Sequence, residues 1–256
     1  MSEQTKFVIF AGPRTGSTYL VDFLNSVSET RCYAELFQKD RIDFRHHEPV
    51  DPRLSDVGFR DASPLEFLRL LGEEARPCRR FGCKIVGLQS LKPTPEFLRE
   101  ICTDRSWRKI YLWRDDLFEQ AVSFALAERH FGRGLWERTP DARRIALSPQ
   151  DLMARLHLLQ REYLAIEAVL GTAHTEDILS LEYRDLRQAQ AVCNLLRFLG
   201  APEPSIESAT AALAPGGELE FKAGPALSER IANFAEIRRF LLNSRYRRFV
   251  EPEPSG

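Results

Sequence analysis

The stretch FVIFAGPRTGSTYL, residues 7–20, decides the fold of this chain. An apolar run ends at Gly12, and from Gly16 onward apolar residues recur at the three- and four-residue steps of a helix. Backbone N–H groups point outward where a strand ends at a glycine and continues as a helix, and the helix dipole adds partial positive charge there. The sequence therefore predicts an anion-binding turn between a first strand and a first helix.

The turn lacks the lysine of a nucleotide-triphosphatase loop. That loop reads GxxxxGK[ST], with the lysine on the outer phosphates and the hydroxyl on magnesium. Here the spacing is one residue shorter, Arg14 is the cation of the turn, and Ser17 and Thr18 add hydroxyl donors. This composition favours a phosphate or phosphosulfate group that needs no metal. A turn with incidental glycines and no ligand is the competing interpretation of this stretch taken alone.

Strands and helices alternate along the rest of the chain. Apolar runs predict further strands at residues 81–88, 109–113 and 178–183, with helices between and after them. Such alternation is typical of right-handed crossovers and a parallel sheet. Residues 38–62 are polar and are expected to form a long loop, and residues 250–256 a disordered tail. No linker-like segment interrupts the pattern, so we expect one α/β domain over residues 1–256.

Composition excludes several classes of protein. Of 256 residues, 36 are Lys or Arg and 37 are Asp or Glu, and this balance argues against a general nucleic-acid binder. No apolar stretch approaches the ~18 residues of a membrane span, and the N-terminus does not resemble a signal peptide. The five cysteines form no CxxC pair, which argues against a disulfide framework or a zinc site. We expect a cytoplasmic protein without a membrane span or a metal.

Several segments resemble sulfotransferases that use 3′-phosphoadenosine 5′-phosphosulfate (PAPS). PRTGSTYL (13–20) resembles their 5′-phosphosulfate loop, and LWRDDLFEQAVSFALA (112–127) their 3′-phosphate segment. LEYRDL (181–186), running into LLRFLGAP (195–202), is similar to the module near the adenine. The segments occur in the family's order, and the subgroup they most resemble is the bacterial trehalose 2-sulfotransferase type, with nodulation-factor sulfotransferases also near.

The resemblance implies a P-loop nucleotide-hydrolase-like sulfotransferase fold, in which helices flank a central parallel sheet, with PAPS as sulfuryl donor and no metal. The cofactor-binding residues that it implies are Arg14, Thr15, Gly16, Ser17, Thr18, Arg114, Ser123, Tyr183 and Lys222. An arginine at a strand end can hold a phosphate through two parallel N–H bonds, which a lysine cannot do. The chain departs from many relatives at Asp115, where a proline often stands.

Sulfuryl transfer needs an in-line acceptor oxygen, a base for its proton, and positive charge on the departing phosphate. Stabilisation of charge and positioning should dominate, as in phosphoryl transfer. Arg14 lies in the loop expected to hold that phosphate. Glu35, within CYAELF (32–37), matches the catalytic glutamate of the trehalose-type subgroup. Because cytosolic relatives use histidine, the alternative bases are His46, His47 and His130.

The acceptor is expected to be a hydroxyl of a carbohydrate, a glycolipid or another small molecule. Its expected contacts are Glu35, Lys84, His47 and Trp136. Lys84 resembles a lysine that the family often places near the acceptor, and Trp136 could stack on a sugar. Two other functions stay open: a P-loop small-molecule kinase, and a catalytically silent anion- or glycan-binding module. The oligomeric state is also open, with a homodimer as one option.

Overall fold

The computed structural model describes residues 4–87, 94–129, 144–213 and 226–250. Of the predicted site residues, Lys222 and Trp136 lie outside these ranges, as do the alternative base His130 and most of the predicted tail. The chain divides into two compact units. One comprises Met1–Trp113 with Glu162–Phe221, and the other Arg114–Arg161 with Lys222–Gly256. The single domain expected over residues 1–256 stays a prediction, and each unit is described by itself.

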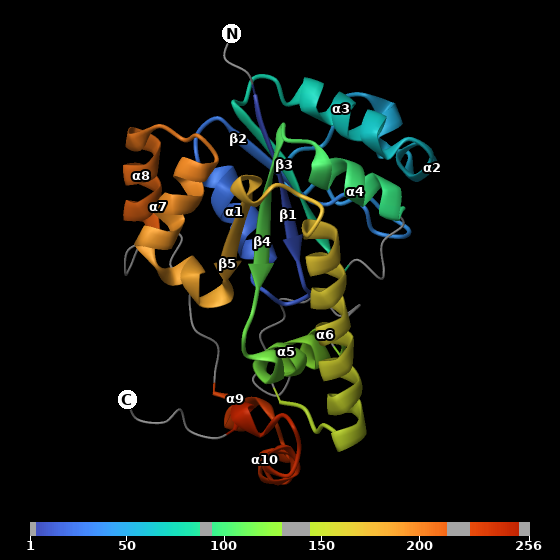
Figure 1. Ribbon diagram of the computed structural model, residues 1–256, viewed down its shortest axis with the longest axis vertical. Helices are drawn as coiled ribbons and strands as arrows, with labels where there is room; N and C mark the ends of the chain where they lie inside the picture. Colours follow the sequence, from blue (N-terminus) through green and yellow to red (C-terminus); the bar gives the residue numbers. More distant parts are fainter. Residues whose placement is uncertain (1–3, 88–93, 130–143, 214–225, 251–256) are drawn as a thin grey trace. The chain divides into compact units, whose positions relative to one another are not determined.

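The first unit contains a five-stranded, all-parallel sheet in the order β2-β3-β1-β4-β5 (Figure 1). The strands are β1 (Thr5–Ala11), β2 (Thr30–Glu35), β3 (Arg80–Val86), β4 (Trp107–Trp113) and β5 (Ile178–Glu182). The predicted fold class is confirmed. After β3 the chain crosses β1 to continue on its other side, so the turn after β1 lies where the strand order reverses. In open α/β sheets, ligands bind at such points, outside the carboxyl ends of the strands.

Helices cover both faces of this sheet (Figure 1). The helices of the first unit are α1 (Ser17–Ser26), α2 (Val57–Ala62), α3 (Pro64–Glu74), α4 (Pro95–Thr103), α7 (Ala189–Phe198) and α8 (Glu203–Leu213). Val8 and Phe10 of β1 pack in one apolar cluster with α3 and α4, whereas Phe7 and Ile9 pack in another with α1 and α7. A strand that is buried on both faces reads as a continuous apolar run, which is why residues 6–11 predicted it.

Three elements depart from the sequence-based expectation. β2 was not predicted as a strand, and α8 was not predicted as a helix. Residues 38–62, expected to be a loop, contain a short 3₁₀ turn (Pro52–Ser55) and α2. β2 is an edge strand of six residues, TRCYAE, in which only the threonine is β-branched. Its propensity signal is therefore weak, and its pairing with β3 and burial decide its conformation.

β3 approaches β1 closely at a glycine. Gly82 is the register partner of Phe7, and a Cβ atom at Gly82 would lie 2.4 Å from the Phe7 ring. No real Cβ tolerates such a contact, so the phenylalanine occupies the space that any other residue at 82 would need. The pair fixes β3 on the side of β1 that carries the site described below.

The second unit is helical. It contains α5 (Leu117–Arg129), the part of α6 (Pro149–Leu170) up to Arg161, α9 (Leu227–Arg230) and α10 (Phe234–Leu242). A parallel bridge joins Ile145 to Ile231, and the Asn233 side chain bonds to both the N–H (3.1 Å) and the carbonyl (2.8 Å) of Leu147. These contacts join segments that are more than 80 residues apart in the sequence.

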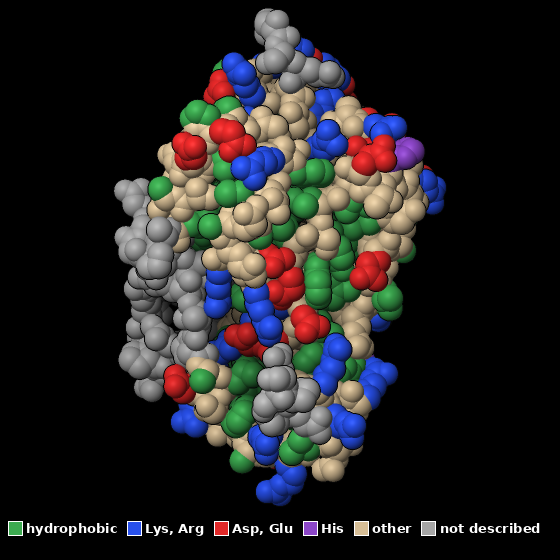
Figure 2. Space-filling model, turned by 60° about the vertical axis from the view of Figure 1, so that its left-hand side comes forward, with side chains coloured by type: hydrophobic (Ala, Val, Ile, Leu, Met, Phe, Trp, Pro, Cys, Tyr) green, Lys and Arg blue, Asp and Glu red, His purple; other side chains and the backbone are tan. Residues whose placement is uncertain are grey.

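Acidic and basic side chains are interspersed on the face shown in Figure 2, in keeping with the net charge of −1. Within the described residues, no helix is long and apolar enough to cross a membrane. The same part of the chain contains no cluster of His, Cys, Asp and Glu suited to a metal ion.

Candidate active site

The turn after β1 contains two residues with an unusual backbone conformation. Arg14 (φ 63°) and Gly16 (φ 77°) both adopt left-handed conformations, which non-glycine residues rarely do. The buried Thr15 hydroxyl donates to the Gly12 carbonyl at 2.9 Å, so this side chain stabilises the turn. Thr15 can therefore contact a ligand through its backbone. α1 begins at Ser17, and the preceding Gly16 has no side chain to cap it. The start of α1 therefore suits an anion.

Tyr183 packs directly against this turn. It opens a 3₁₀ turn (Tyr183–Arg187) that follows β5, and a Cβ at Gly16 would lie 3.1 Å from its ring. The guanidinium of Arg187 lies 5.7 Å from the centre of the same ring, within the range of a cation–π contact. The structure thus brings together the predicted phosphosulfate loop and the tyrosine predicted to pack near the adenine.

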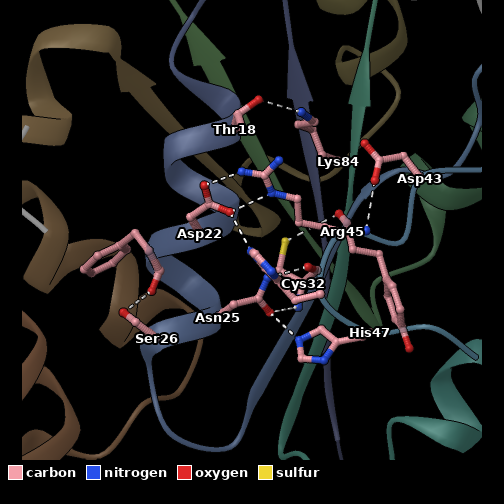
Figure 3. Close-up of polar contacts among 12 residues, drawn as sticks. Thr18, Asp22, Asn25, Ser26, Cys32, Asp43, Arg45, His47 and Lys84 are labelled. Atoms are coloured by element: carbon pink, nitrogen blue, oxygen red, sulfur yellow. Dashed lines mark hydrogen bonds and ion pairs between the residues drawn. The ribbon is translucent and has the colours of Figure 1, made fainter. Parts of the chain in front are cut away.

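Glu35, Lys84 and Thr18 form one polar cluster. The Lys84 ammonium on β3 lies 3.0 Å from the Glu35 carboxylate. It also donates to the Thr18 hydroxyl at 3.2 Å (Figure 3). A register shift between Tyr33 and Glu35 places Glu35 opposite Lys84 at the end of β2. The Lys84 side chain is only 2% exposed, whereas that of Glu35 is 29% exposed. Lys84 therefore acts as an internal anchor, and the carboxylate can still receive a proton from a bound molecule.

A second polar network ties the segment after β2 to α1. Asp22 accepts from the Arg45 guanidinium at 2.9 and 2.8 Å and pairs with His46 at 2.9 Å (Figure 3). Burial raises the pKa of Asp22, but the hydrogen bonds from Arg45 and His46 outweigh it, and the pKa lies below its ordinary value. Arg45, at φ 67°, also donates its backbone N–H to Asp43 at 2.9 Å. The network engages His46 with Asp22 on α1.

His47 belongs to a different group of residues from Glu35. Its Nε2 lies 3.1 Å from the Asn25 side-chain oxygen, and its ring packs edge-on against Tyr33. Asn25 is seven residues after Thr18, about 10 Å further along α1, and Figure 3 shows the two at different levels of the helix. Burial and the nearby Arg31 lower the pKa of His47. Of the described base candidates, Glu35 is the one that the structure connects to the turn.

The predicted 3′-phosphate residues lie in the second unit. Arg114, the residue after β4, is 4% exposed and forms an ion pair with Glu119 in the first turn of α5. Ser123 is four residues after Glu119 and hence on the same helix face. The Asp116 carboxylate accepts the Glu119 N–H at 2.8 Å and so caps the start of α5. Asp116 thus helps to start α5 directly after Asp115, the position at which the chain departs from the expected pattern.

Sequence analysis did not identify Arg230, Asp22 or Arg45. Arg230 donates to Glu119 at 2.7 Å across 111 residues, and Arg45 meets Asp22 across 23. Burial raises the pKa of Glu119, but Arg114 and Arg230 outweigh it, and the pKa lies below its usual value. Arg230, Asp22 and Arg45 lie outside the segments that resemble the family, and only the folded chain brings them to their partners.

The fold is that of a sulfotransferase. It is similar to the sulfotransferase domain from the curacin biosynthetic pathway, with a TM-score of 0.50 and 17% identity over 80% of this chain and 77% of that one. A mouse sulfotransferase complexed with PAP aligns with a TM-score of 0.49 and 13% identity, over 97% of this chain and 88% of that one. No family model matches the sequence.

One characterised relative spans nearly the whole chain. Nodulation protein H of Rhizobium meliloti (strain 1021) is 26% identical over 251 residues, which are 96% of this chain and 94% of that protein. Over nearly its whole length the chain is thus similar to nodulation protein H, and its fold is that of sulfotransferases.

Proposed function

We propose that this protein transfers the sulfuryl group of PAPS to a hydroxyl of a carbohydrate, a glycolipid or another small molecule. The observation that carries the proposal is the Glu35–Lys84–Thr18 cluster, in which the Lys84 ammonium contacts both the Glu35 carboxylate and the first turn of α1. A base is thereby linked to the helix start that suits an anion. Sulfuryl transfer needs this pairing, because the proton leaves the acceptor as charge develops on the phosphate.

On the donor side, Arg14, Gly16, Ser17 and Thr18 are proposed to hold the 5′-phosphosulfate, with Thr15 bracing the turn. The left-handed backbone at Arg14 and Gly16 and the start of α1 at Ser17 support this role. Tyr183, packed on Gly16, is proposed to contact the adenine. For the 3′-phosphate we propose Arg114, Ser123 and Lys222.

In the proposed reaction, the acceptor oxygen bonds to sulfur as the bond from sulfur to the bridging phosphate oxygen breaks. Glu35 takes the hydroxyl proton, and Arg14 stabilises the charge on the departing phosphate. The products are a sulfate ester and 3′-phosphoadenosine 5′-phosphate (PAP), and no metal takes part. Lys84 orients the Glu35 carboxylate, so the base is already in position before the substrate binds.

Lys84, His47 and Trp136 are the proposed acceptor contacts besides Glu35. The hydrogen bond from His47 to Asn25 also supports a role in holding its own segment against α1. We propose that the reaction takes place in the cytoplasm, in agreement with the composition. A homodimer is compatible with the proposal but is not needed for it.

The variant Glu35→Gln tests the base. It keeps the size of the side chain and removes its basicity, so we expect kcat to fall by roughly 10²-fold or more, with PAP affinity retained. The assay is incubation with sulfur-labelled PAPS and a panel of sugars and lipids. Glu48→Gln is the matched control, because Glu48 is exposed in the segment after β2. Full activity of Glu35→Gln would remove Glu35 from the mechanism.

Calorimetry separates the other two functions. A small-molecule kinase binds ATP with magnesium in preference to PAP. A silent module binds PAP but transfers no label to any acceptor. The proposed enzyme binds PAP without a metal and labels at least one acceptor in the panel.

A further inference from the structure

Two buried arginines meet on one carboxylate in the second unit. Arg114 contacts one oxygen of Glu119, and Arg230 donates to the other at 2.7 Å. The side chains of Arg114 and Arg230 are 4% and 10% exposed, against 32% for Glu119. The carboxylate thus bridges two guanidinium groups that come from segments more than 100 residues apart.

One buried donor of this cluster suits a further acceptor. Polar and charged groups are costly to bury unless they are matched. In the part of the chain that the structure describes, the buried Nε of Arg230 has no hydrogen-bond partner. A phosphate offers several acceptor oxygens and up to two negative charges, which suits converging guanidinium groups.

Arg230 is held firmly where it meets Glu119. Its carbonyl accepts the Ile145 N–H at 2.9 Å, and the Ala232 N–H donates to the Ile145 carbonyl at 2.7 Å. These bonds clamp the end of α9 on both sides of Ile231. At the other end, Asp116 caps α5 and so fixes Glu119. The backbone positions of both partners are thus set by their own hydrogen bonds.

We propose that Arg230 is a further residue of the 3′-phosphate site, and that Glu119 holds Arg114 and Arg230 side by side for that phosphate. The inference rests on the proposed function, because it assigns the 3′-phosphate of PAPS to the Arg114 cluster. Ser123, one helical turn beyond Glu119 on the same face, adds a hydroxyl donor. Arg230 then contributes to discrimination between PAPS and nucleotides that lack the 3′-phosphate.

The test compares PAP with AMP, which differ by the 3′-phosphate alone. Calorimetry on the full chain gives both dissociation constants, and their ratio measures the contribution of that phosphate. In Arg230→Gln we expect the preference for PAP to fall about tenfold or more, which is the scale of a charge-assisted hydrogen bond. AMP affinity should stay within about twofold, which also shows that the variant is folded. The preference for PAP in Arg230→Lys should lie between those of the wild type and Arg230→Gln, because an ammonium keeps the charge but lacks the planar fork of a guanidinium.

Arg238→Gln is the matched control, since it removes the same charge from an exposed position on α10 of the same unit. It should leave the preference for PAP unchanged. If the wild-type protein binds PAP no better than AMP, the proposed 3′-phosphate site fails and Arg230 with it. If the wild type prefers PAP and both Arg230 variants keep that preference in full, the assignment of Arg230 alone is overturned. Should Arg230→Gln also lose AMP binding, the ratio of the two dissociation constants in the milder variant Arg230→Lys decides whether Arg230 contacts the 3′-phosphate.

Discussion

At the scale of single residues, Lys84 connects Glu35, the proposed base, to the start of α1. A lysine that is 2% exposed carries a desolvation cost, which the Glu35 carboxylate and the Thr18 hydroxyl offset. The sequence shows only a lysine within an apolar strand. Such a lysine is equally consistent with a side chain at the site and with one that reaches solvent. The register of β2 against β3 decides between the two, because it sets Glu35 opposite Lys84.

Replacement of Lys84 by methionine should reduce turnover. Without the ammonium, the Glu35 carboxylate loses the contact that orients it, and misplacement of about 1 Å can cost on the order of 10²-fold in rate. We expect kcat to fall by roughly 10- to 100-fold, with a smaller change in the KM for PAPS. Steady-state kinetics at several PAPS concentrations measure both.

Lys109→Met is the control for loss of a buried lysine. Lys109 is fully buried on β4 and donates to the Asp104 carbonyl at 2.7 Å. Burial lowers its pKa, as expected of an ammonium removed from water. It does not contact Glu35, so this variant should retain kcat. An equal loss of kcat in both variants would mean that Lys84 matters for the fold and not for the base.

The residues of the site differ in how far sequence alone reveals them. Arg14, Gly16 and Ser17 follow from the physics of a strand–turn–helix, because glycine spacing and a helix start are local properties. Glu35 was selected only through resemblance, since a lone glutamate between apolar residues carries no chemical signature. Arg230 could not be selected at all, because its partner is 111 residues away.

At the scale of elements, the contact between β1 and β3 depends on the absence of a side chain at Gly82. Gly82→Ala would place a methyl group 2.4 Å from the Phe7 ring, which must then shift within a packed core. We expect a loss of about 1–3 kcal/mol in the free energy of unfolding. Urea titration followed by circular dichroism gives this quantity.

Gly72→Ala provides the comparison for Gly82→Ala. Gly72 lies inside α3, where its added Cβ would be 3.3 Å from the edge of the Phe81 ring. The mild crowding that this Cβ causes is partly offset by the better helix propensity of alanine, worth about 1 kcal/mol. The change in unfolding free energy should therefore be much smaller than for Gly82→Ala. Equal destabilisation by both substitutions would argue against the close approach of Phe7 and Gly82.

Among the elements, the sequence predicted those with strong periodicity or an uninterrupted apolar run. β1, β3, β4 and β5 were expected within two residues of their observed bounds. β2 was not predicted because its pairing with β3 is non-local, and an edge strand can be short and mixed in composition. α2 escaped because the prolines and the glycine around it dominate the local signal, although Asp56 caps it by accepting the Gly58 N–H at 2.8 Å.

At the scale of the whole molecule, ligand binding should raise thermal stability. A ligand at 100 times its Kd adds about 2.7 kcal/mol to the folded state. For a chain of this length that amounts to an increase in Tm of roughly 5–10 °C. We expect this shift with PAP, unchanged by EDTA, in a thermal melt. ATP with magnesium should give little or none, and the reverse order would favour the kinase.

The order of the strands could be predicted only in part. Alternating strands and helices imply a parallel sheet, because crossovers return each strand to the same direction. The identity of the central strand depends on side-chain packing between distant segments. The strand order therefore became known only from the structure. The turn at residues 12–16 lies at the carboxyl edge of the sheet because it follows β1, and the strand order reverses at this strand.

The contact of Tyr183 with Gly16 limits how the chain can evolve. A substitution at Gly16 meets a backbone at φ 77° and two side chains, the Tyr183 ring and Leu186, each 3.1 Å from the new Cβ. A smaller residue at 183 would remove the contact with the ring but leave the other two obstacles. No single compensating change restores the turn, so we expect glycine at this position to persist in descendants of this chain for as long as the turn retains its conformation.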